Sequence, residues 1–177
     1  MTLGRIVIVL LLLVALVAGA SLYYLQIYGY YYAVEPDPGR DVLLVSDATN
    51  APEPIPYDAF QGIDADSSPI RYRACFSTSA TPEALAESYV PVADATPRNA
   101  PFWFECFDAK DIASEIETGN AQVFLGGKNI RYGVDRYVAI TSEGRGFAWN
   151  ELNNCGAKAY DGTVIGEECP PLDPPSD

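Results

Sequence analysis

The sequence predicts an α+β protein with one N-terminal transmembrane helix and one small domain outside the membrane. Residues 6–25 form an apolar run without a charged side chain, and a helix of that length spans ~30 Å, the thickness of a bilayer's hydrocarbon core. Strand-like and amphipathic helical segments follow the run. All four cysteines also follow it. We therefore expect a mixed-sheet domain with two helices and a C-terminal antiparallel meander, stapled by disulfides.

The apolar run predicts a signal anchor with a defined direction. Arg5 is the only charged residue in residues 1–34, so the positive-inside rule places the N-terminus in the cytoplasm and the domain in the periplasm, beyond the inner (plasma) membrane. Six tyrosines at the end of the run are expected at headgroup level: Tyr23, Tyr24, Tyr28, Tyr30, Tyr31 and Tyr32. The alternative is a signal peptide cleaved after Ala20, because residues 18–20 are small.

The composition divides the chain into four parts. Residues 1–34 are the cytoplasmic start and the transmembrane signal anchor, and residues 35–40 are a linker in which prolines and a glycine end the helix. Residues 41–169 are the periplasmic α+β domain, long enough for one hydrophobic core. Residues 170–177 have no periodicity and are predicted to be a disordered tail.

The first half of the domain predicts two strand–helix units. Residues 41–46 are predicted to form a first strand, residues 47–69 mostly loop, and residues 70–76 an alternating strand. A helix follows, with Thr81 as its N-cap and Pro82 in its first turn. It is expected to continue to residue 90, because Pro91 then stops it.

The second unit repeats this order. Residues 102–107 are predicted to form an aromatic strand that ends in Cys-Phe, as residues 70–76 do. Asp108 caps the next helix, an apolar stripe marks its buried face, and Gly119 ends it. If the two units are parallel neighbours, Cys75 and Cys106 lie at equivalent strand ends and form a disulfide. Cys155 and Cys169 are then the second pair.

The last third predicts the antiparallel meander. Its strands are expected at residues 121–125, 132–141 and 146–150. The glycine-rich residues 126–129 and residues 142–145 are expected to form the two turns that connect them.

The distribution of charge suggests a contact surface. The formal net charge is −13, which argues against nucleic acid as a partner. Residues 119–150 are the exception, because four cations there outnumber Asp135 and Glu143. The cations are Lys128, Arg131, Arg136 and Arg145. We expect them to contact another membrane or periplasmic protein; the alternative is that they offset the domain's own acids.

The absence of histidine removes the commonest general base and the commonest metal ligand. No nucleotide or nucleophile motif replaces it, so we expect no catalytic residue, cofactor or metal, and the balance is against an enzyme. The sequence predicts a non-catalytic, membrane-anchored accessory or interaction protein. A periplasmic sensor or small-ligand binding domain is the alternative, and a hydrolase that uses only carboxylates is the third hypothesis.

The chain resembles an uncharacterised family of small single-pass envelope proteins from Rhodobacter-type alphaproteobacteria. The residues that carry the resemblance are 4–7, the tyrosine belt, residues 124–136 and residues 144–149. The resemblance implies a domain of unknown function and supplies no functional residues. Members of this family sometimes carry a histidine kinase label, which a chain without histidine contradicts.

Overall fold

The computed structural model of the protein describes residues 2–171, and Met1 and residues 172–177 lie outside the described part. Most of the tail predicted at residues 170–177 therefore falls outside the described residues. The chain divides into two compact units, Met1–Tyr32 and Ala33–Asp177.

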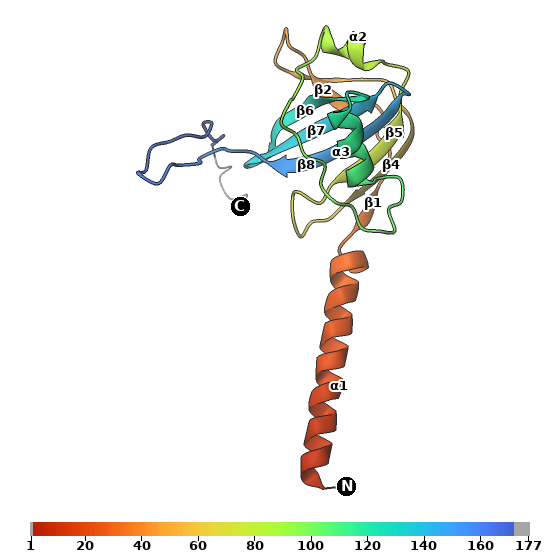
Figure 1. Cartoon of the computed structure of the whole chain (residues 1–177), viewed down its shortest axis with the longest axis vertical. Coiled ribbons are helices and arrows are strands. Elements are labelled where there is room, and N and C mark those ends of the chain that lie inside the picture. The colour runs from red at the N-terminus through yellow and green to blue at the C-terminus, as the bar shows by residue number, and fades with distance from the viewer. Residues whose placement is uncertain (1, 172–177) are drawn as a thin grey trace. The chain divides into compact units, whose positions relative to one another are not determined.

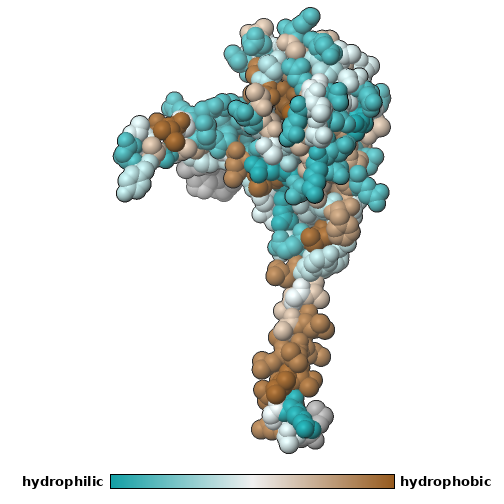
Figure 2. Space-filling view, in the orientation of Figure 1, coloured by the Kyte–Doolittle hydropathy of each residue, from teal (hydrophilic) through white to brown (hydrophobic). Residues whose placement is uncertain are grey.

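The first unit is a single apolar helix. α1 (Leu3–Tyr24) continues into one turn of π-helix, η1 (Leu25–Gly29). No residue of α1 is buried, and Figure 2 shows apolar side chains along the visible face of the helix. Among the described residues, this is the one helix that is long and apolar enough to cross a membrane. It indicates a single-pass membrane protein or a signal anchor.

The second unit is built on a mostly antiparallel sheet (Figure 1). Within the described residues the sheet has six strands in the order β1 (Tyr32–Val34), β4 (Asp58–Asp64), β5 (Arg73–Ser77), β8 (Arg145–Leu152), β7 (Val134–Thr141) and β6 (Ala121–Arg131). A smaller sheet pairs β2 (Leu43–Val45) with β3 (Pro52–Pro54). The predicted α+β fold class is confirmed, although β3 and β4 occupy residues predicted to be mostly loop.

The two faces of the large sheet are covered by different segments. One face packs against β2 and the residues around it, in a core that includes Leu44, Phe124 and Ile140, each with none of its surface exposed. On the other face, the ring of Phe107 packs edge-on against Phe147 and Trp149 of β8. α3 (Ala109–Glu117) follows Phe107 and lies across this face (Figure 1). Covering both faces removes the apolar side chains of each strand from water.

The meander is confirmed, but its first turn is misplaced in the prediction. β6 continues through the glycines to Arg131, and the chain turns at residues 132–133. Gly126 is needed for close packing, because a Cβ atom there would lie 3.1 Å from the carbonyl oxygen of Leu43 in β2. The register of β6 against β7 shifts on both sides of Gly127, so the strand absorbs these residues as an irregularity.

Both predicted helices exist, with the predicted caps. The hydroxyl of Thr81 accepts a hydrogen bond from the backbone N–H of Ala84 at the start of α2 (Pro82–Ala86). α2 ends earlier than predicted, because the next residues bond to β2, where Val90 N–H donates to the carbonyl of Val45. Asp108 caps α3 by accepting from the N–H groups of Lys110 and Asp111.

The strand predicted at residues 102–107 is wrong. This segment forms turns, and its buried rings are Phe104 and Phe107, three residues apart, whereas Phe102 is 67% exposed. A strand would bury alternate residues, so the observed spacing fits a turning chain that covers the sheet. Cys106 lies in this segment and is bonded to Cys75 of β5, with 6.2 Å between the two Cα atoms. The predicted Cys75–Cys106 disulfide is therefore present. The two parallel strands from which it was predicted are not, because Cys106 lies in a turn.

Candidate functional site: a disulfide-closed loop and an apolar groove

A loop closed by the second disulfide follows the sheet. β8 ends at Leu152, and residues 153–169, here called the C-terminal loop, extend away from the sheet (Figure 1). Cys155 and Cys169 are bonded at the base of the loop, with their Cα atoms 4.9 Å apart. Among the described residues no free cysteine remains, so these thiols take part in the architecture and not in nucleophilic chemistry.

The C-terminal loop has an ordered backbone. Ala159 N–H donates to the carbonyl of Thr163 at 2.8 Å, and Ile165 N–H donates to the carbonyl of Ala157 at 3.0 Å, as in a short hairpin. Gly166 allows the returning chain to pass close to the base, because a Cβ atom there would lie 1.8 Å from the carbonyl oxygen of Asn154. The loop therefore presents its tip in a defined conformation.

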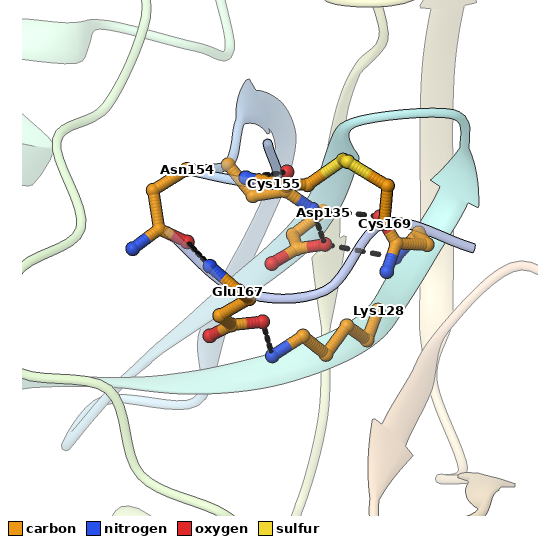
Figure 3. The surroundings of a disulfide bond; sticks show 8 residues. Lys128, Asp135, Asn154, Cys155, Glu167 and Cys169 are labelled. Atoms are coloured by element: carbon orange, nitrogen blue, oxygen red, sulfur yellow. Dashed lines mark hydrogen bonds and ion pairs between the residues drawn. A yellow bond between two sulfur atoms is a disulfide. The ribbon is translucent and has the colours of Figure 1, made fainter. Parts of the chain in front are cut away.

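A buried carboxylate fixes the base of the loop to the β6–β7 hairpin. Asp135 is 5% exposed, and one of its oxygens accepts 2.8 Å hydrogen bonds from Asn129 N–H and from the Asn153 side chain. Lys128 of β6 makes an ion pair with Glu167 on the returning strand of the loop (Figure 3). Hydrogen bonds to a buried charged acceptor stabilise more than neutral ones, so Asp135 is the main anchor.

The tip of the C-terminal loop carries apolar side chains that face water. Tyr160 is fully exposed, and Val164 and Ile165 are 61% and 65% exposed. Figure 2 shows the resulting hydrophobic patch on the projecting loop. A hydrogen bond from the backbone N–H of Thr163 lowers the pKa of the neighbouring Asp161, so the tip combines apolar surface with a carboxylate.

An apolar groove lies between β2 and β6. It encloses about 390 Å³ and its charged lining residue is Lys128. Its apolar walls include Leu43, Val45, Val90, Leu125 and Ile130. This volume is at the small end of the range for ligand pockets, ~300–1,000 Å³. The Lys128 side chain thus connects the groove with the base of the C-terminal loop, through its ion pair with Glu167.

The four cations predicted to contact a partner do not form one patch. Lys128 and Arg131 are on β6 near its hairpin with β7, whereas Arg145 follows the β7–β8 turn at the other end of the meander. Arg145 pairs with Asp111 and Glu115 of α3. The positive charge of Arg145 is therefore balanced by carboxylates of the same domain.

Arg136 is also engaged within its own chain. Its Nε donates to the side chain of Asn150 at 3.0 Å, and its guanidinium lies 3.7 Å from the centre of the Tyr72 ring. Burial raises the pKa of Asp64, and the positive charges of Arg136 and Arg131 oppose that shift. A role of these cations in binding a partner stays a prediction.

The apolar tip of the C-terminal loop was not predicted from the sequence. The signal that could have found it is local: Val164 and Ile165 interrupt a polar, glycine-containing stretch between two cysteines. The predicted interface tyrosines all belong to the unit Met1–Tyr32, and their place at a membrane surface stays a prediction. The described residues contain no group of three or more side chains suited to hold a metal ion.

Comparison with known protein families places most of the domain in one family model. A family model described as a family of unknown function (DUF6446) matches residues 42–170, which span β2 to the end of the C-terminal loop. None of the curated proteins and none of the solved structures compared with the chain matches it.

Proposed function

The chain belongs to the DUF6446 family of unknown function, and we propose that it is a non-catalytic, membrane-anchored interaction protein whose contact element is the C-terminal loop. The observation that carries this proposal is the exposure of Tyr160, Val164 and Ile165 on a loop held by a disulfide and a buried carboxylate. Apolar side chains that cluster on an exposed surface are a feature of contact sites. The hydrogen-bonded loop also loses little freedom when it binds.

The proposed location is the periplasmic side of an inner membrane, with the N-terminus in the cytoplasm. Two disulfides support an oxidising compartment for the domain. Arg5 supports this orientation of α1. The resemblance to single-pass envelope proteins of Rhodobacter-type alphaproteobacteria is consistent with both. Addition of a membrane-impermeant protease to intact spheroplasts tests the orientation: cleavage of the domain is expected, and protection would contradict it.

The proposed contact element is tested by photo-cross-linking in native membranes. A photoactivatable residue at position 160 is expected to give a cross-linked product, because the Tyr160 side chain is fully exposed at the tip. The matched control places the same residue at Tyr132, which is 53% exposed at the β6–β7 turn, outside the loop. Equal products from both positions, or none from position 160, would count against the loop as the contact element.

The predicted cations are tested in the same membranes. Lys128 also lines the groove between β2 and β6 and needs a separate test; if Arg131, Arg136 and Arg145 form a second contact region, changing these three to Glu removes the cross-linked product. An unchanged product limits their role to the ion pairs and ring contacts within the domain.

A further inference from the structure

The loop tip and the groove have matching chemistry on the same domain. The tip presents Tyr160, Val164 and Ile165 beside the ionised carboxylate of Asp161. The groove presents apolar walls beside the ammonium group of Lys128. If a tip enters a groove, its apolar side chains contact the apolar walls, and the Asp161 carboxylate meets the Lys128 ammonium group.

We infer that the partner of the C-terminal loop is a second copy of this chain, and that the tip of each copy packs into the apolar groove of the other. This inference rests on the proposed function, since it names the partner of the same contact element. Because the same two copies exchange their tips reciprocally, the contact has two-fold symmetry and closes as a dimer.

The structure also explains why the tip is available to another copy. The tip is exposed in its own chain, and the loop extends away from the sheet (Figure 1). The Lys128–Glu167 ion pair joins two side chains that are each nearly half exposed. Such surface pairs contribute little and exchange readily, so Lys128 can accept a second carboxylate.

The membrane anchor favours this association. Two copies held by α1 in one membrane have a raised effective concentration, so a contact of modest area is enough to populate a dimer. The inference therefore applies to the full chain in a bilayer.

The test uses charge exchange between two tagged copies of the full chain, co-expressed and cross-linked in native membranes. Lys128→Glu and Asp161→Lys are each expected to reduce the cross-linked dimer about tenfold, because a two-fold dimer loses the contact twice and gains repulsion. Mixing the two variants is expected to restore the dimer, since the carboxylate introduced at position 128 of one copy then meets the ammonium group introduced at position 161 of the other.

Glu167→Gln is the matched control. It breaks the same intramolecular ion pair as Lys128→Glu and leaves the charge of the groove unchanged, so the dimer is expected to persist. Ile130→Ser alters the apolar lining of the groove and is expected to reduce the dimer. Tyr132 lies outside the groove lining, so Tyr132→Ser is not expected to reduce the dimer.

Three outcomes would overturn the inference. The first is a wild-type chain that is monomeric in membranes. The second is failure of the mixed variants to restore the dimer. The third is a small molecule or another protein whose binding is lost with Ile130→Ser while the oligomeric state is unchanged. If the chain is monomeric and position 160 still cross-links to a different protein, the proposed function stands and this inference fails.

Discussion

The two disulfides are predicted to contribute unequally to the stability of the domain, although both close a loop. Cys75 is 7% exposed on β5, between β4 and β8, and its bond to Cys106 holds the segment that covers one face of the sheet. The cysteines are 31 residues apart, so the loss of loop-closure entropy in the unfolded chain corresponds to about 3.7 kcal/mol. Since a domain of this size is stable by ~5–15 kcal/mol, the double variant Cys75→Ala/Cys106→Ala loses a large share.

The Cys155–Cys169 bond supplies the matched control. Its cysteines are 14 residues apart, and the same relation gives a loop-closure contribution of about 3 kcal/mol. That contribution is lost in full only if the folded state keeps the loop ordered without the bond. No described residue after Glu151 is buried, so the loop can open without exposing the core. We therefore expect Cys155→Ala/Cys169→Ala to lower the global free energy of unfolding by less than ~1 kcal/mol.

Thermal unfolding of the full chain in detergent, followed by circular dichroism, compares the two variants. The Cys75/Cys106 variant is expected to unfold ~7–15 °C below the wild type, and the Cys155/Cys169 variant within a few degrees of it. Limited proteolysis is expected to cut the second variant in the C-terminal loop first. A larger loss of stability in the Cys155/Cys169 variant would refute the reasoning that the loop opens independently of the core.

Three further predictions concern single residues. Asp135→Ala leaves the half-buried N–H of Asn129 without its acceptor, and we expect a loss of ~1–3 kcal/mol in urea unfolding together with faster proteolysis of the C-terminal loop. Tyr72 is 3% exposed and its hydroxyl has no hydrogen-bond partner among the described residues, so Tyr72→Phe is expected to stabilise by ~1 kcal/mol. Burial raises the pKa of Tyr72 to about 12, whereas the tyrosine of the unfolded chain ionises near pH 10. The wild type therefore loses stability as the pH rises from about 10 to about 12. Tyr72→Phe cannot ionise, so urea unfolding should show a smaller loss of stability for this variant across that range. Gly166→Ala places a methyl group against the carbonyl of Asn154, so proteolysis of the loop is expected to accelerate while the melting temperature stays unchanged.

The features that the sequence predicted correctly have local causes. Asp108 caps α3 through its own neighbours along the chain, and the stripe that includes Ile112 is buried as its spacing requires. The β7–β8 turn lies at residues 142–144, one residue shorter than predicted, and is closed locally by a hydrogen bond from Gly144 N–H to the carbonyl of Thr141. Signals of this kind act over a few residues, so they can be read before the fold is known.

The errors have tertiary causes. Gly126 looks like a turn residue, but its small size serves the approach of Leu43, which is far away in the sequence. Residues 102–107 have the aromatic composition of a strand. Phe107 nevertheless packs against Phe147 and Trp149 on the face of the sheet, so the segment covers the sheet and does not join it. Propensity alone cannot distinguish a strand from a segment that covers one.

The same limit applies to the count of charges that suggested a contact surface in residues 119–150. The cations of residues 119–150 exceed the acids of that window, but their partners come from outside it: Glu115 for Arg145, and Glu167 for Lys128. Charge on a window of sequence therefore does not give the charge on a surface. A cluster of exposed apolar side chains is different in kind, because it is observed on the folded surface and not counted along a window of sequence. The exposed tip of the C-terminal loop is thus the stronger indication of a contact, and the Asp135 anchor that holds the loop in place is the part of the site that only the fold reveals.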